Sequence, residues 1–222
     1  MKKNKEWSRY LQLAKERPDM FINQGELDIV MDEQTVCDFE AESHKTIGVV
    51  YESPYHILVV DLVKNPRNQL FAYERVMPAV QKGAVVAIPV CEGKIVLLNQ
   101  YRHALRGGQY AFPRGFAEPG LTPTENVIKE LREEVNGVVK NTYFLGNVIA
   151  DSGFEGNQVA VYLCDLSSYS LQYQHEGIQN LAILTLSELQ QWIHDGKIND
   201  GFTLSALTLW EANRKKYDVQ LI

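Results

Sequence analysis

The sequence predicts a mixed α/β protein in which helices cover a β-sheet. β-Rich runs bounded by turn residues fill the stretch between residues 46 and 99. A strongly capped helix over residues 122–136 then stands among further strands, and two helices close the chain. Strands, an embedded helix and closing helices, in this order, are typical of a layered α/β or α+β domain.

In the N-terminal part, the sequence predicts one short helix and a β-hairpin. Apolar residues recur at helical spacing over residues 5–17, and Pro18 marks the end of this helix. The turn sequence Asn-Pro-Arg-Asn at residues 65–68 separates two β-rich runs, which we expect to pair as a hairpin. The strands expected here are residues 46–51, 55–63 and 70–76.

The later elements are expected around one clear helix. Two β-rich runs on either side of Glu92-Gly93 predict a second hairpin, and a loop rich in Arg and Gly comes next. Thr122 and Glu125 form a T-x-x-E capping box at the start of the helix. The expected strands are residues 84–90, 94–99, 142–150, 158–166 and 181–185, and the closing helices are residues 187–194 and 203–215.

Composition narrows the class of protein. The 22 Lys and Arg against 28 Asp and Glu give a net charge of −6, which argues against binding DNA or RNA. Cys37, Cys91 and Cys164 are scattered, so we expect neither a disulfide framework nor a zinc site, but a reducing cytoplasm. The first residues lack an apolar stretch, and no apolar run approaches the roughly 20 residues that span a bilayer. We therefore expect neither a signal peptide nor a membrane partner.

The informative feature is a cluster of carboxylates on the central helix. Glu130, Glu133 and Glu134 stand at i, i+3 and i+4 and so share one helical face. Clustered carboxylates repel one another unless a positive charge neutralises them, and oxygen ligands suit Mg²⁺ or Mn²⁺. The alternative is a solvated face on which Arg132 pairs with its acidic neighbours, since exposed helical charges commonly serve only solubility.

The segment before this helix favours the metal interpretation. A Gly-containing loop with Arg102, Arg106 and Arg114 runs directly into the acidic helix and places anion-binding groups beside the expected cation site. Chemistry on phosphate esters or anhydrides requires this combination, because the metal and the arginines share the developing negative charge.

At these residues the sequence resembles the Nudix hydrolases. Their box reads G-x5-E-x7-R-E-U-x-E-E-x-G-U, with U an aliphatic residue. Gly115 fills the first position, and residues 130–134 fill the E-U-x-E-E segment in register. In the family, the carboxylates at these positions bind the metal, so the resemblance implies that this chain keeps its metal-binding residues.

Three positions of the box depart from the family pattern. Leu121 stands in place of the first Glu, Lys129 replaces the Arg, and Asn136-Gly137 replaces the closing pair. In the family, that Glu and that Arg pair and support the geometry of loop and helix. We therefore interpret the loss of the Glu and the change of Arg to Lys as one coupled change in the pair that supports the loop and the helix.

The resemblance extends over residues 45–212. Both before the box and in residues 176–207, the sequence is similar to Nudix members of the ADP-ribose pyrophosphatase type. It implies an α/β/α Nudix sandwich with a mixed sheet, preceded by an N-terminal helix and β-hairpin region. The expected domains are residues 1–44, an N-terminal helix and extension; residues 45–80, a β-strand region for dimerisation; and residues 81–222, the Nudix hydrolase domain.

The resemblance also assigns roles to single residues. The expected Mg²⁺ ligands, with Mn²⁺ as a substitute, are Glu130, Glu134 and the backbone carbonyl of Arg114. The expected acid–base residues are Glu133 and Glu176, although Glu176 is equally well explained as an ordinary loop charge. The expected substrate-binding residues are Arg102, Arg75 and, less directly, Glu74.

The implied function is metal-dependent hydrolysis of a nucleoside diphosphate linked to another group, such as ADP-ribose or a nucleotide sugar, to two monophosphates. ADP-ribose members commonly carry Pro in a loop after the box, where this chain has Ser152, so the preference among such substrates stays open. The alternative is a Nudix scaffold that binds a nucleotide as a sensor or regulator, motivated by Leu121 and Lys129. We expect a cytoplasmic protein and, by resemblance, a homodimer with a small-molecule substrate.

Overall fold

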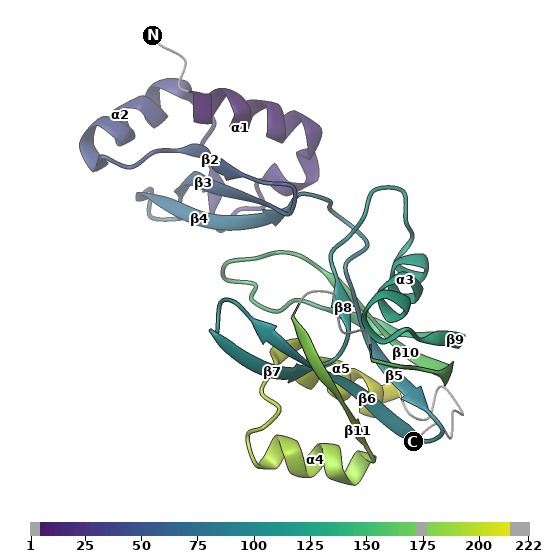
Figure 1. Cartoon of the computed structure of the whole chain (residues 1–222). Helices are drawn as coiled ribbons and strands as arrows, with labels where there is room; N and C mark the ends of the chain where they lie inside the picture. Colours follow the sequence, from purple (N-terminus) through teal and green to yellow (C-terminus); the bar gives the residue numbers. More distant parts are fainter. Residues whose placement is uncertain (1–4, 172–176, 214–222) are drawn as a thin grey trace. The chain divides into compact units, whose positions relative to one another are not determined.

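The computed structural model describes residues 5–171 and 177–213. The chain divides into two compact units, one of residues 1–81 with 151–157, the other of residues 82–150 with 158–222 (Figure 1). In the part of the chain that the structure describes, no helix is long and apolar enough to cross a membrane.

The N-terminal unit is a small antiparallel sheet covered by helices. Strand β3 lies at its centre, with β4 along one side and with β2 and β1 along the other. Figure 1 shows α1 and α2 on one side of this sheet. Its elements are α1 (Lys5–Glu16), the 3₁₀ turn η1 (Pro18–Phe21), β1 (Asp28–Ile29), α2 (Glu33–Ser43), β2 (Gly48–Glu52), β3 (His56–Lys64) and β4 (Leu70–Pro78).

The helix and the hairpin expected in this unit are confirmed. The hairpin of β3 and β4 pairs in unbroken register from His56 opposite Pro78 to Lys64 opposite Leu70. Helix α2 was not expected, because its acidic sequence buries only Val36 and so carries little periodic apolar signal. Its N-cap is Asp32, whose side chain accepts a hydrogen bond from Thr35 N at 2.8 Å.

A buried polar network fastens α1 to the hairpin. Asp61, only 2% exposed on β3, accepts hydrogen bonds from Arg75 Nε at 2.6 Å and from the Tyr10 hydroxyl at 2.5 Å. Burial and the neighbouring Asp61 carboxylate raise the pKa of Tyr10 well above its ordinary value, so the phenol stays protonated. The guanidinium of Arg75 also donates to Met20 O at 2.8 Å and lies over the Phe21 ring.

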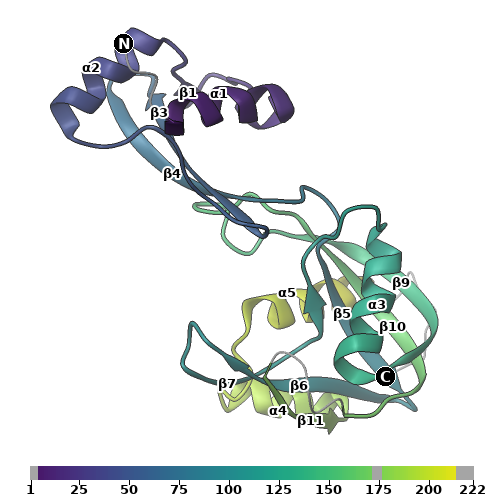
Figure 2. The same ribbon diagram turned by 45° about the horizontal axis from the view of Figure 1, so that its top comes forward.

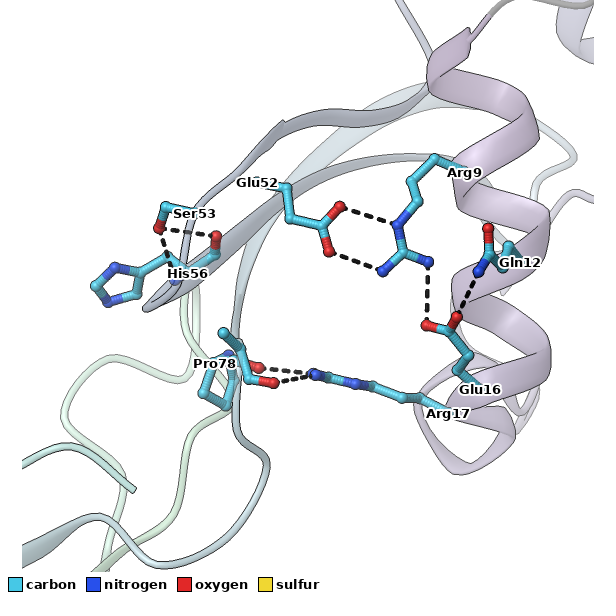
Figure 3. Close-up of polar contacts among 9 residues, drawn as sticks. Arg9, Gln12, Glu16, Arg17, Glu52, Ser53, His56 and Pro78 are labelled. Carbon is cyan, nitrogen blue, oxygen red and sulfur yellow. Dashed lines mark hydrogen bonds and ion pairs between the residues drawn. The ribbon is translucent and has the colours of Figure 1, made fainter. Parts of the chain in front are cut away.

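Two arginines of the N-terminal segment make further links within this unit (Figure 3). Arg9 donates to both carboxylate oxygens of Glu52, at 2.9 and 2.7 Å, and the hydrogen bond lowers the pKa of Glu52. Arg17 donates to the carbonyls of Pro78 and Ala79, at 2.6 and 2.5 Å. The first helical segment is therefore tied by side chains to β2 and to the end of β4.

The loop of residues 151–157, which contains Ser152, belongs to this unit although it lies far along the chain. Phe154 O accepts a hydrogen bond from Val76 N at 2.8 Å, and Gly153 O accepts one from the Tyr73 hydroxyl at 2.7 Å. The loop is thus hydrogen-bonded to strand β4.

The second unit is a mixed sheet with helices on both faces. The strand order is β11-β6-β5-β10-β9, with β7 paired to β6 and β8 paired to β5. Strands β5 and β10 are parallel, and the other pairs are antiparallel. Its elements are β5 (Val85–Cys91), β6 (Lys94–Arg102), β7 (Gly107–Ala111), β8 (Arg114–Gly115), α3 (Pro123–Val135), β9 (Val138–Val148), β10 (Val159–Ser168), β11 (Ile178–Leu184), α4 (Leu186–His194) and α5 (Gly201–Asn213).

Apolar side chains on both faces of this sheet form two cores. One core packs α3 against the sheet, and the other packs α4 and α5 against the opposite face (Figure 2). Strand β5 is buried along its whole length because both of its faces are covered. The predicted α/β/α sandwich with a mixed sheet, preceded by a helix and β-hairpin region, is confirmed.

One segment of this unit differs from the expectation. Residues 107–111 were expected in a loop, but they form strand β7 and pair with β6 from Gly107 opposite Arg102 to Ala111 opposite Leu98. Strands β5 and β6 pair only beside their turn, at Val90–Ile95 and Cys91–Lys94. They then separate, and each takes a new partner, which is how β7 and β8 enter the sheet.

Candidate active site

Helix α3 has the boundaries that its caps predict. Thr122 accepts a hydrogen bond from Glu125 N, while the Glu125 carboxylate accepts from Thr122 N at 2.8 Å, so the capping box is complete. The helix ends at Asn136, whose φ of 46° is left-handed. Asn136 stands where the family box has Gly, and an Asn tolerates this backbone conformation better than most residues.

The apolar face of α3 determines where its carboxylates lie. Val127, Leu131 and Val135 are fully buried against the sheet. Glu130 and Glu134 are one turn apart at the margin of this buried face, and both reach the strand β8 that precedes the helix. Hydrophobic packing thus sets the rotation of the helix and brings two carboxylates to one stretch of backbone.

Gly115 makes room for Glu130. A Cβ at residue 115 would lie 2.1 Å from Glu130 Cδ and 2.2 Å from its Oε1. A side chain at this position can be accommodated only if the Glu130 carboxylate moves, so the observed approach of the carboxylate to the backbone requires glycine. This contact explains physically why a Gly and a Glu recur together in the box.

Glu134 holds the neighbouring residue of the same strand. Its side chain accepts a hydrogen bond from Arg114 N at 3.1 Å, and the residue is only 4% exposed. The Arg114 guanidinium forms an ion pair with Asp200 at 2.8 Å and lies over the Phe202 ring. Arg114 is therefore held through its backbone by α3 and through its side chain by the start of α5.

Lys129 is shared by three carboxylates. Its Nζ lies 2.9 Å from Glu118 Oε1, 2.5 Å from Glu133 Oε2 and 3.7 Å from Glu130 Oε1. Burial alone would lower the pKa of Lys129, but the hydrogen bonds to Glu133 and Glu118 and the charge of Glu130 raise it above the ordinary value. The ammonium therefore stays protonated and compensates part of the negative charge of the cluster.

Glu118 was not identified from the sequence, and it explains the coupled change in the box. Position 121 holds Leu instead of Glu, but Glu118 reaches the helix from the same loop and pairs with Lys129. The sequence does contain a sign of this replacement, because Glu118 stands three residues before Leu121, the position at which the family has Glu. Spacing alone did not reveal it, because the path of the loop decides which residue reaches Lys129.

Two other contributions were missed. Asn126 on α3 is fully buried and donates to Gly83 O and Phe116 O, both at 2.8 Å. It thereby links the helix to the residues just before β5 and just after β8. Asp200 and Thr203 contact residues 112–114 from the start of α5. The sequence could have revealed them, because an Asp three residues before a Thr is typical of a helix start. We expected the helix to begin at Thr203, whereas it begins at Gly201, directly after Asp200.

The expected site residues are divided between the two units. Arg114, Glu130, Glu133 and Glu134 lie together, with the Glu133 side chain half exposed, and Arg102 ends the neighbouring strand β6. Glu74 and Arg75 lie on β4 of the N-terminal unit. Glu176 is outside the described residues. The Arg75 guanidinium is engaged by Asp61, through hydrogen bonds of 2.6 and 3.1 Å.

The oxygen donors at the site are few and come from both side chains and backbone. Within residues 5–171 and 177–213, no three acidic, histidine or cysteine side chains come close enough to form a metal-binding group. Mg²⁺ commonly takes only one or two carboxylates from a protein and completes its shell with water and substrate phosphates. Two carboxylates beside a backbone segment are therefore a donor set that fits such an ion.

Comparison with known proteins identifies the family. The model of the NUDIX domain matches residues 81–202. The chain is 30% identical over 185 residues to the methanol dehydrogenase activator of Bacillus methanolicus, a match covering 80% of this chain and 98% of that protein. It is 26% identical over 138 residues to the ADP compounds hydrolase NudE of Escherichia coli, covering 62% and 74% respectively.

A solved structure supports the same fold. The crystal structure of an ADP compounds hydrolase matches with a TM-score of 0.70 over 88% of this chain and 97% of that one, at 18% sequence identity. The expected resemblance is thereby confirmed, together with the enzyme class that it implied. The chain belongs to the Nudix family and is, by class, a pyrophosphohydrolase.

Proposed function

We propose that the protein hydrolyses the diphosphate linkage of a nucleoside diphosphate joined to a second group, giving two monophosphates. The observation that carries this proposal is that Glu130 and Glu134 meet the backbone of Arg114 and Gly115. ADP-ribose and nucleotide sugars are the favoured substrates, which agrees with the name of the relative NudE.

We propose Mg²⁺ as the metal, with Mn²⁺ as a substitute, held by Glu130, Glu134 and the carbonyl oxygen of Arg114. Nudix hydrolases generally use divalent metal ions, and the donors here are all oxygen. When bound, such an ion neutralises phosphate charge and lowers the pKa of a bound water. The buried Glu134 contributes by fixing the Arg114 backbone as well as by its own charge.

We propose Glu133 as the residue that accepts the proton of the attacking water. Its half-exposed carboxylate lies on the same face of α3 and is oriented by Lys129 at 2.5 Å. Glu176 stays the alternative proton acceptor.

For the substrate we propose Arg102 as a phosphate-binding residue and Glu74 as a candidate for the second group. Arg102 ends β6, the strand whose partner β7 leads into Arg114. Like Glu74, Arg75 was expected to bind the terminal portion of the substrate, but its guanidinium donates to Asp61 and to Met20 O. We therefore propose a structural role for Arg75.

The substitution Glu134→Gln tests the proposed function. Gln keeps an oxygen that can accept from Arg114 N but loses the negative charge, so we expect turnover to fall at least about a hundredfold with the fold intact. Phosphate release should be measured after alkaline phosphatase treatment, with Mg²⁺ and with Mn²⁺, on ADP-ribose, nucleotide sugars, NADH, FAD, coenzyme A and diadenosine polyphosphates. Glu92→Gln, on an exposed turn, is the matched control. Unchanged turnover of Glu134→Gln would refute the site.

A second candidate function is that of a nucleotide-binding regulator with weak catalysis. It is favoured by the changed box positions Leu121 and Lys129 and by the relative that is named a methanol dehydrogenase activator. Silence across the substrate panel, combined with tight nucleotide binding by calorimetry, would favour this function. A single strong hydrolysed substrate would exclude it as the main role.

We also propose a homodimer in a reducing cytoplasm, with neither nucleic acid nor a membrane as a partner. Cys37, Cys91 and Cys164 are all free thiols, which suits a reducing compartment. The acidic balance disfavours nucleic acids. Light scattering at micromolar concentration tests the dimer, and a monomer alone would refute it.

A further inference from the structure

The first turn of α5 is built around a buried Asp–Thr pair that does more than cap the helix. Asp200 Oδ2 accepts hydrogen bonds from Thr203 N at 2.9 Å and from Thr203 Oγ1 at 2.8 Å, which is an ordinary N-cap. Its other oxygen, Oδ1, accepts from Arg114 Nη1 at 2.8 Å. Both residues are shielded from water, Asp200 at 6% and Thr203 at 0% exposure.

The same pair also holds the backbone that leads into β8. The Thr203 hydroxyl donates to Asp200 and accepts a hydrogen bond from Phe112 N at 3.0 Å. Phe112 is fully buried, so its N–H would lose its acceptor if this hydroxyl were removed. One hydroxyl thus connects the helix cap to the backbone two residues before Arg114.

Residues 112–114 are therefore held from three directions. Strand β5 binds them through the hydrogen bond from Ala87 N to Pro113 O at 2.9 Å. Helix α3 holds Arg114 N through Glu134, and α5 holds the Arg114 side chain and Phe112 N. The contact from α3 comes from within the box, whereas β5 precedes the box and α5 follows it.

We propose that Asp200 and Thr203 are positioning residues of the hydrolytic site. They act through Arg114 and Phe112, and fix the backbone carbonyl that we assign as a metal ligand. This inference rests on the proposed function. An N-cap requires only one oxygen of Asp200, so the second oxygen and the lone pair of Thr203 Oγ1 are the parts that serve the site.

Two disruptive variants, a conservative variant and a matched control separate positioning from helix stability. Thr203→Val keeps the shape of the side chain and removes the hydroxyl, whereas Thr203→Ser retains it. Asp200→Asn still caps the helix, because Asn is as good an N-cap as Asp, but it removes the charge that holds Arg114. Thr208→Val is the matched control, since Thr208 lies on the same helix, is exposed and bonds only within it, to Leu204 O.

The readouts are Mn²⁺ binding by electron paramagnetic resonance, kcat at saturating substrate, and the thermal midpoint. We expect Thr203→Val and Asp200→Asn to weaken Mn²⁺ binding about 10-fold or more and to lower kcat, because loss of residues that orient metal ligands typically costs about 10- to 100-fold. Thr203→Ser should stay within about 3-fold of wild type, and Thr208→Val should behave as wild type.

Two results overturn the inference in distinguishable ways. If the wild-type protein neither binds Mn²⁺ nor hydrolyses any substrate, the proposed function fails and the inference fails with it. If the wild type does both, while Thr203→Val and Asp200→Asn bind Mn²⁺ and turn over as the wild type does, the proposed function stands. The positioning role is then refuted, whether or not the thermal midpoints of the two variants fall.

Discussion

The two units of the molecule differ in how many carboxylates pair with each positively charged side chain. In the N-terminal unit, each of two arginines pairs with one or two carboxylates: Arg75 makes two hydrogen bonds to Asp61, and Arg9 makes two to Glu52 and one to Glu16. In the second unit, three carboxylates share the single ammonium of Lys129, and a fourth, Glu134, is buried nearby.

This difference separates structural charges from functional ones. In the matched pair of Arg75 and Asp61, the two charges neutralise each other, and Asp61 also binds Tyr10 and so stabilises the packing of α1 against its sheet. A cluster with more negative than positive charge costs stability, because the carboxylates repel one another, unless a cation binds there. The comparison therefore favours the α3 face, and not the Arg75 network, as the metal site that we propose.

The largest expected effect tests the matched pair. Asp61→Asn leaves the Arg75 guanidinium without its carboxylate in a position where the pair is mostly buried. We expect a loss of about 3–5 kcal/mol in the free energy of unfolding of the N-terminal unit, the usual cost of breaking a buried ion pair. Urea unfolding followed by amide hydrogen exchange in β3 and β4 measures it.

The same variant tests the separation of roles. Well below its unfolding temperature, Asp61→Asn should retain the wild-type kcat, because the α3 site does not include Asp61. A large fall in kcat or a large rise in KM with little loss of stability would contradict the structural role of Arg75 and return that residue to the substrate site.

The second effect tests the carboxylate cluster. Gly115→Ala places a methyl group where the Glu130 carboxylate lies, 2.1 Å from its Cδ, so the carboxylate must move. Displacing a catalytic group by about 1 Å typically costs about a hundredfold in rate, and we expect a loss of this size with a small change in stability. Gly156→Ala is the control, because nothing lies within 4 Å of its added Cβ and its φ is not left-handed. Equal rates for the two variants would show that the position of Glu130 is unimportant.

The smallest effect sharpens the role of Glu118. Glu118→Gln breaks its contact with Lys129, a pair in which both partners are partly exposed, so we expect only about a 2- to 5-fold loss of kcat. Adding Leu121→Glu and Lys129→Arg to this variant restores the family's own pair and should recover the lost activity. Failure of the triple variant to improve on Glu118→Gln would contradict the idea that Glu118 replaces the missing Glu.

Several elements could be predicted because their signals are local. The capping box of Thr122 and Glu125, the turn at residues 65–68 and the turn at Glu92-Gly93 each lie within a few residues, and α3 and both hairpins formed as expected. Strand β7 could not be predicted in this way. Its residues become a strand only because β6 separates from β5 and pairs with them, which is a non-local event.

The sequence by itself determined the kind of chemistry. The box spacing puts Glu130, Glu133 and Glu134 on one face of a helix, and helix geometry makes that placement independent of the rest of the protein. Only the tertiary structure decided which distant residues complete the site. Asp200 and Thr203 reach residues 112–114 because α5 packs on the sheet, Glu118 reaches Lys129 because of the path of its loop, and Arg75 is engaged by Asp61 because β3 and β4 pair. Contacts between segments far apart in the chain depend on packing, and no local pattern encodes them.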